Sequence, residues 1–360
     1  MILDDLPIYF LAANSADGFI NGFSGAYSHK DGWRAYLIKG GPGTGKSSFM
    51  KKLATYSVSK GIYTEIVACS SDPNSLDAVV MPYEKIIVLD ATAPHTVDPD
   101  YPGVCEEILN FGQFWDTSLI QKEKQRIIAL TEKNKELHRR ASRILSAIGQ
   151  LRRNEMKISL VATDIDKTFD YAIRLAKRYI KTNPAQGKEW VRYLSAVTPE
   201  GVVFYKDTID KLCTHKVIIS DEYGTVSNII FSVIRDWALK NGQEIITVKN
   251  NLLPGEQTDH ILIPSLSLAF CSSRAGMELE DEAVRKIHAS RFMNREILRE
   301  NRSRITFTRR LTKELLFSAV TTLKEAKEVH DALESYYIKA MDFNELSAFY
   351  ENFTRKLFKN

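Results

Sequence analysis

The chain has 360 residues, of which 44% are hydrophobic and 26% are charged, so it can bury a sizeable core and is long enough for two domains. Its formal net charge of +4 is too small to indicate a nucleic-acid or membrane partner by itself. There is no long apolar run, and the acidic beginning lacks the basic residues of a signal peptide, so we expect a cytoplasmic protein without a membrane span.

The first chemical motif is a glycine-rich loop, LIKGGPGTGKSS, at residues 37–48. It has the phosphate-binding spacing G-x-x-x-x-G-K-(S/T), after an apolar strand end at 36–38 and before a predicted helix at 49–57. Glycines let successive backbone N–H groups point into one concavity at the start of that helix, which suits a polyphosphate. The predicted nucleotide-binding residues are Gly40, Gly41, Gly43, Thr44, Gly45, Lys46, Ser47 and Ser48.

A carboxylate that could assist this loop follows the next strong strand pattern, IIVLD at 86–90. Asp90 and the Ser47 hydroxyl are the predicted ligands of Mg²⁺, and Lys46 would reach the β- and γ-phosphates. Asp90 alone could equally be a turn or cap residue, and the loop upstream favours the metal role. No N-K-x-D motif for guanine is present, so ATP is the expected nucleotide.

The second half of the sequence repeats the first. Residues 9–20 match 192–203, and in the same alignment Gly43 and Thr44 fall on Gly224 and Thr225. The chemistry is lost there, because Gly40 is replaced by Asp221, Lys46 by Ser227 and Asp90 by Ser272. We therefore predict an α/β chain with two tandem copies of a P-loop NTPase fold, mainly parallel sheets flanked by helices. The predicted domains are 1–184 and 185–360, and the second has a degenerate site.

Each copy is expected to carry a long helical extension, at about 104–180 and 278–357. Apolar residues at heptad spacing predict a long helix or a helical hairpin packed by a coiled-coil seam. One heptad position holds Ile120, Ile127, Ala141 and Ile148, and the other holds Leu130, Leu137, Ile144 and Leu151. Both extensions are basic. The spacing of Arg291, Arg295, Arg299 and Arg302 predicts one helix face, which could contact nucleic-acid phosphate, an acidic membrane or another protein, or could simply be solvated.

The four cysteines have no close pair and no C-x-x-C spacing, so the sequence indicates neither a zinc site nor disulfides. Cys69 follows a predicted strand and would face the same sheet edge as the loop. Packing as a small hydrophobic residue is the simplest interpretation of its role.

The loop, Asp90 and the altered second copy resemble an uncharacterised family of tandem P-loop ATPases of Gram-positive bacteria. The segments CSSDPNSLD (69–77) and DATAPH (90–95) carry the resemblance further, and it covers the whole chain. It implies an ATPase whose biological role is not established. Family members keep a second phosphate loop in the C-terminal half, and this sequence departs from the family there.

Within these two segments, Asp72, Asp77, Thr92 and His95 are expected to gather at the sheet edge beside the phosphates. Asp72 or Asp77 could orient the attacking water and His95 could sense the γ-phosphate. Each also has a structural alternative as a turn, cap or packed residue.

The leading functional hypothesis is a slow ATPase or nucleotide-dependent switch. Ala91 occupies the position after Asp90 where many ATPases have a glutamate, so hydrolysis should be slow. The inert copy would pack on the first as a pseudo-dimer partner, with Arg274 as a candidate arginine finger. The alternatives are a small-molecule kinase with the extension as a lid, and a nucleotide-gated protein that binds nucleic acid or protein through its basic helices.

Overall fold

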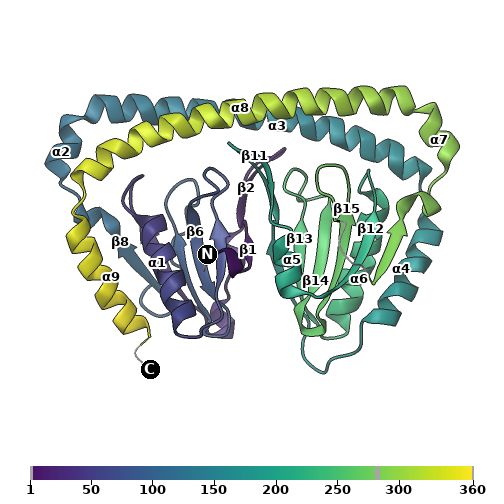
Figure 1. Cartoon of the computed structure of the whole chain (residues 1–360), viewed down its shortest axis with the longest axis horizontal. Coiled ribbons are helices and arrows are strands. Elements are labelled where there is room, and N and C mark those ends of the chain that lie inside the picture. The colour runs from purple at the N-terminus through teal and green to yellow at the C-terminus, as the bar shows by residue number, and fades with distance from the viewer. Residues whose placement is uncertain (1–2, 280–283, 359–360) are drawn as a thin grey trace.

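The computed structural model describes residues 3–279 and 284–358, which form two α/β units side by side beneath a pair of long helices (Figure 1). Each unit contains one six-stranded mixed sheet with helices packed against it. In each sheet the strands are mostly parallel, and one strand runs opposite to its two neighbours.

The first sheet has the order β1-β5-β6-β7-β4-β8. Its strands are β1 (Ile8–Tyr9), β4 (Arg34–Lys39), β5 (Glu65–Ala68), β6 (Leu76–Met81), β7 (Ile86–Asp90) and β8 (Glu106–Asn110). Strand β4, between β7 and the edge strand β8, is buried over four consecutive residues, as expected for a strand covered on both faces. β4 and β7 are parallel neighbours, so the loop after β4 and the carboxylate that ends β7 come to the same sheet edge.

The second sheet has the order β9-β13-β14-β15-β12-β16, which matches the first sheet strand for strand and direction for direction. Its strands are β9 (Lys188–Arg192), β12 (His215–Ser220), β13 (Glu244–Lys249), β14 (Thr258–Ile263), β15 (Leu268–Ser273) and β16 (Arg285–His288). A hairpin accompanies each sheet, formed by β2 (Ala12–Ser15) with β3 (Gly18–Asn21), and by β10 (Ser195–Thr198) with β11 (Gly201–Phe204).

One helix follows the equivalent strand in each unit, α1 (Lys46–Ser59) after β4 and α6 (Thr225–Lys240) after β12. The short α5 (Asp207–Leu212) precedes β12. The helix α4 (Ile165–Tyr179) packs on α6 and the second sheet, whereas α9 (Phe343–Leu357) packs on the first sheet. Each unit is therefore completed by a helix from the other half of the chain. The predicted boundary at 184 falls between α4 and β9, but the packing units are not contiguous in sequence.

The long helices α3 (Lys124–Ala162) and α8 (Arg302–Ala340) run antiparallel across both units (Figure 1). They follow the short helices α2 (Thr117–Lys122) and α7 (Arg295–Glu300). Half of the predicted seam is buried, and its partner is α8 rather than a hairpin within the first half. The buried positions are Ile127, Leu137, Ala141 and Ile148, whereas Leu130, Ile144 and Leu151 are half-buried and Ile120 lies in α2. The two predicted extensions also begin too early, because β8 and β16 first complete the sheet edges.

The two units share a hydrophobic core. Phe10 and Tyr193 exchange backbone hydrogen bonds of 2.7 and 3.0 Å, and one buried cluster includes Leu37 of the first unit and Ile218 of the second. Among the described residues, no helix combines the length and apolar character needed to cross a bilayer.

Candidate functional site

The glycine-rich loop, defined as residues 40–48, comprises the connection after β4 and the first residues of α1. Gly43 and Gly45 have φ angles of +69° and +82°, in the left-handed region that glycine adopts without strain. The buried Thr44 hydroxyl donates to the Gly41 carbonyl at 2.8 Å and fixes the turn. Helix α1 starts directly after Gly45, so its free N–H groups and positive dipole end face this loop. Of the eight predicted nucleotide-binding residues, five lie in the connection before α1, and Lys46, Ser47 and Ser48 are the first residues of α1.

Lys46 lies across the loop. Its Nζ donates to the carbonyls of Gly40 at 3.2 Å and Gly41 at 2.7 Å, and lies 3.6 Å from Asp90 Oδ2. The Lys46 and Asp90 side chains are only 12% and 15% exposed, so their attraction is screened less than at a surface. This arrangement brings together the two residues that sequence analysis placed forty-four positions apart.

Ser47 and Asp90 both lie at this edge, and their oxygen atoms are of the kind that Mg²⁺ prefers. The Ser47 Oγ accepts a hydrogen bond from the Leu76 N–H at 3.0 Å, and Asp90 Oδ1 accepts one from the Thr92 N–H at 2.8 Å. Each side chain retains further lone pairs. Both side chains are therefore candidate ligands of a hard divalent cation.

The residues of the two further segments separate into two groups. Asp77 on β6 and His95 in the loop after β7 come together, with His95 Nε2 3.4 Å from Asp77 Oδ2 and both residues buried. The Asp72 side chain has other partners. It accepts from the Ser75 hydroxyl at 3.0 Å and lies 3.6 Å from Lys327 Nζ of α8. Of the residues expected at this edge, Asp77 and His95 therefore contact each other through their side chains, whereas the Asp72 carboxylate bonds within its own turn.

Cys69, after β5, joins the Asp77–His95 pair. Burial, followed by the nearby Asp77 carboxylate, raises the pKa of the Cys69 thiol. Burial also raises the pKa of Asp77, with a smaller contribution from Asp90, while His95 opposes the rise. This pocket of the sheet edge is thus unfavourable to negative charge unless a cation compensates it.

Glu334 of α8 reaches the glycine-rich loop, and sequence analysis missed it. Its Oε1 accepts a hydrogen bond from the Gly43 N–H at 3.1 Å, across 291 residues of chain. A side chain at Gly43 would meet the Glu334 carbonyl oxygen at 2.8 Å, so glycine is needed for the close approach of α8 as well as for its φ angle. His330, 3.4 Å away, and then the Gly43 N–H hold the pKa of Glu334 below its usual range, despite partial burial.

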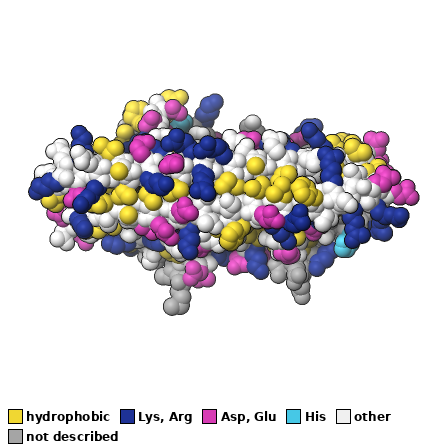
Figure 2. Space-filling model, turned by 90° about the horizontal axis from the view of Figure 1, so that it is seen from above, with side chains coloured by type: hydrophobic (Ala, Val, Ile, Leu, Met, Phe, Trp, Pro, Cys, Tyr) yellow, Lys and Arg dark blue, Asp and Glu magenta, His cyan; other side chains and the backbone are white. Residues whose placement is uncertain are grey.

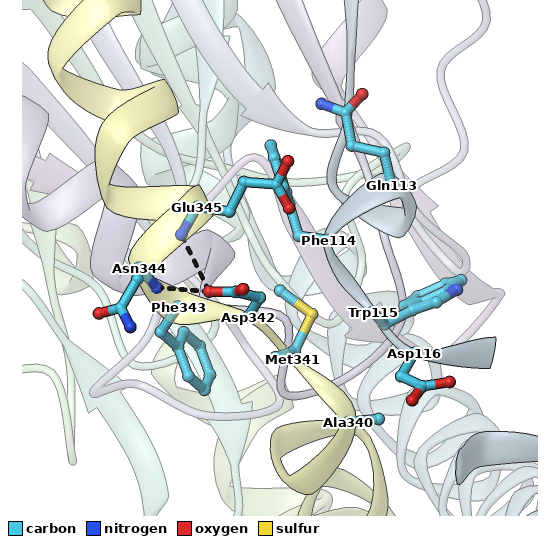
Figure 3. Close-up of a pocket in the computed structure, with 10 residues that line it drawn as sticks. All are labelled: Gln113, Phe114, Trp115, Asp116, Ala340, Met341, Asp342, Phe343, Asn344 and Glu345. Atoms are coloured by element: carbon cyan, nitrogen blue, oxygen red, sulfur yellow. Dashed lines mark hydrogen bonds between the residues drawn. The ribbon is translucent and has the colours of Figure 1, made fainter. Parts of the chain in front are cut away.

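A cleft of about 600 Å³ lies beside this contact, between residues 113–116 and the α8–α9 junction at 340–345 (Figure 3). Two backbone hydrogen bonds of 2.8 Å, Asp116 N–H to Ala340 and Asp342 N–H to Phe114, join the two segments. Asp342 also caps α9 through the Asn344 and Glu345 N–H groups, as Figure 3 shows. These hydrogen bonds therefore fix the turn from α8 into α9, close to the glycine-rich loop that α8 covers.

In the second unit, the loop between β12 and α6 corresponds to the glycine-rich loop, and its own side chains occupy the start of the helix. Asp221 is buried, and its Oδ2 accepts the Ser227 N–H at 2.8 Å at the start of α6. A carboxylate therefore already occupies the helix N-terminus. Arg274 forms two hydrogen bonds with buried Asp259, at 2.8 and 3.1 Å, and is 11% exposed. Its expected role as an arginine finger is contradicted, because this paired guanidinium is held inside the second unit.

The outer face of the long helices carries both signs of charge. Figure 2 shows Lys and Arg interspersed with Asp, Glu and hydrophobic side chains on this face. Several basic side chains form ion pairs within the same helix, such as Lys135 with Glu132 at 2.8 Å. The arginines predicted to share one helix face instead occupy three elements: Arg291 lies in a 3₁₀ turn (Ala289–Phe292), Arg295 and Arg299 in α7, and Arg302 begins α8.

In comparisons with known proteins, no protein-family model, curated protein or solved structure matches this chain.

Proposed function

We propose that the chain is a P-loop nucleoside-triphosphate-binding protein with one MgATP site at the glycine-rich loop, and that its two halves are tandem copies of one fold. The observation that carries the proposal is the position of Lys46 within the loop, 3.6 Å from Asp90. A cationic side chain, free helix N–H groups and a nearby carboxylate are what a polyphosphate with its cation requires. The matching strand order of the two sheets supports the duplication.

In this proposal different groups of the chain bind the phosphates and the Mg²⁺ ion. Lys46 would exchange the Gly40 and Gly41 carbonyls for phosphate oxygens, and the loop N–H groups would orient the anion. Ser47 and Asp90 would hold Mg²⁺, which supplies charge neutralisation between the phosphates. The second loop would bind no polyphosphate, because the Asp221 carboxylate occupies the equivalent helix start.

Hydrolysis should be slow. Ala91 after Asp90 is buried and offers no group to activate water, and Asp72 is occupied by its own turn. Asp77 and His95 are buried in a separate pair. We therefore favour a nucleotide-dependent switch or slow ATPase over an efficient hydrolase.

The contact of α8 supports the switch form of the proposal. Glu334 accepts the hydrogen bond of Gly43 N–H, one of the groups that a phosphate oxygen would need. Lys327 of the same helix lies 3.6 Å from Asp72. A nucleotide would displace the Glu334 carboxylate, and α8 would transmit the change to the long helix pair that spans both units.

The test measures ATP binding and turnover with Mg²⁺ by the whole protein, comparing the native chain with Lys46→Ala. Lys60→Ala, an exposed lysine at the end of α1, is the matched control. We expect Lys46→Ala to lose binding and the slow turnover, and Lys60→Ala to keep both. Equal ATP binding by the native protein and Lys46→Ala would refute the proposed site, as would the absence of ATP binding by the native protein.

A further inference from the structure

Three potential metal ligands of different chemistry meet at the edge of the first sheet. Cys69 follows β5, Asp77 lies on β6 and His95 lies in the loop after β7. One ligand atom from each lies within 4.8 Å of the other two. Asp77 and His95 are buried, and the residue Cys69 is partly exposed.

A β-bulge directs Asp77 into this position. Ala78 pairs with Val67, but Leu76 pairs with Ala68, so Asp77 has no partner residue on β5. Bulges of this kind bend the strand and change the direction of a side chain, and they are frequent beside functional sites. The position of the carboxylate thus depends on an irregularity in the strand pairing.

Asp77 and His95 lie close together, but one polar atom of each lacks a hydrogen-bond partner. Their Oδ2 and Nε2 atoms are 3.4 Å apart, with the side chains 5% and 6% exposed. Within the described part of the chain, Asp77 Oδ2 and His95 Nδ1 have no hydrogen-bond partner. Unpaired buried polar atoms are costly, so an ion between the groups would remove a penalty that the protein chain alone leaves.

In the second unit, the negative charge of the equivalent carboxylate is neutralised by a protein side chain. A bulge between β13 and β14 occurs at the equivalent register and leaves Asp259 as the counterpart of Asp77. Asp259 is buried too, but it receives two hydrogen bonds from Arg274 and others from Asn250, the counterpart of Cys69. A fixed cation therefore compensates the carboxylate in one unit, whereas the other has a thiol and an imidazole.

We propose that Cys69, Asp77 and His95 bind a divalent metal ion of the Zn²⁺ class, with a fourth coordination position open to water or substrate. Sulfur, nitrogen and oxygen ligands together suit Zn²⁺ or Co²⁺ better than Mg²⁺, which prefers oxygen alone. Two ligands at Zn–N and Zn–O distances in a tetrahedral site are roughly 3.3 Å apart. The observed 3.4 Å between His95 and Asp77 matches this separation.

This metal site is distinct from the proposed Mg²⁺ ligands. Neither Ser47 nor Asp90 belongs to it. The two sites are neighbours, however, because Ala78 pairs with Leu89 in the antiparallel strands, which brings the preceding Asp77 next to Asp90. The proposal therefore does not depend on nucleotide binding.

The first experiment titrates Co²⁺ into the full-length protein after treatment with a chelator, under reducing conditions. We expect one equivalent to produce a near-ultraviolet sulfur-to-cobalt band together with the visible bands of a tetrahedral ion. Cys69→Ser should lose the sulfur-to-cobalt band, whereas Cys105→Ser, at the other partly exposed cysteine, should keep it. No such band in the native protein, or a band that persists in Cys69→Ser, would overturn the proposal.

A second readout follows Zn²⁺ through thermal unfolding. An ion that binds only the folded chain raises the unfolding temperature, so we expect a shift in the native protein and a smaller or absent shift in Asp77→Asn and His95→Ala. Unchanged shifts in both variants would overturn the assignment of the ligands. Lys46→Ala should keep the Co²⁺ spectrum, so failure of the nucleotide site and failure of the metal site give different results.

Discussion

Removing the negative charge of Glu334 should tighten nucleotide binding. Its carboxylate holds the Gly43 N–H at 3.1 Å, and a phosphate oxygen cannot accept that bond while Glu334 Oε1 occupies the position. The matched pair of changes is Glu334→Gln, which keeps the shape and an acceptor, and Glu334→Ala, which removes both. Glu325→Gln, at an exposed position of the same helix, is the control.

The magnitude follows from the repulsion between two anions. At about 4 Å, two unit charges repel by about 1 kcal/mol in water and by about 4 kcal/mol at an effective dielectric constant near 20. The Glu334 side chain is 35% exposed, so it can swing toward solvent and relieve most of this cost. We therefore expect a gain of about 1–2 kcal/mol, or roughly 5- to 30-fold in the dissociation constant.

The assay is calorimetric or fluorescence titration of MgATP at low and high salt. The gain in Glu334→Gln should shrink as salt rises, because the repulsion is screened. Glu334→Ala should gain at least as much as Glu334→Gln. Unchanged affinity in both variants would show that the carboxylate does not compete with nucleotide. Normal binding with lost turnover would instead assign it a part in the chemistry.

Two further predictions concern the second unit. Asp259→Asn should cost about 3–5 kcal/mol in urea unfolding, because it leaves the Arg274 guanidinium buried without its partner. The double variant with Arg274→Met should recover most of this loss, and an equal loss in both would contradict the reasoning. Burial lowers the pKa of His260 from its ordinary value of 6.5 to about 4. Between these values the unfolded chain binds more protons than the folded one, so the free energy of unfolding should fall as pH drops from 6.5 to 4, by about 3 kcal/mol in total. His260→Leu should remove this part of the pH dependence in unfolding curves at pH 7 and pH 5, and an unchanged slope would contradict the reasoning.

Local sequence patterns predicted the elements that depend on neighbouring residues. The run LIKGGPGTGKSS predicted a strand, a glycine loop and a helix, because apolar strand residues, left-handed glycines and helix-forming residues act within one short segment. The IIVLD run placed Asp90 at a strand end for the same reason. The heptad pattern predicted the buried side of α3, since a helix face is set by its own periodicity.

The partners of those elements could not be predicted in the same way. An apolar helix face is compatible with any apolar surface, so nothing in residues 165–179 or 343–357 specified that α4 and α9 pack on the unit of the opposite half. The same applies to α3, whose seam pairs with α8 instead of folding into a hairpin.

The sequence by itself determined the glycine-rich loop, the Asp90 strand end and the absence of a second G-x-x-x-x-G-K-(S/T) loop, because these are properties of residue type and short spacing. Only the tertiary structure decided that Glu334 reaches Gly43 and that Cys69, Asp77 and His95 meet. The first contact depends on the path of α8 across both units. The second depends on a one-residue bulge in strand register, which no spacing of cysteines or histidines records.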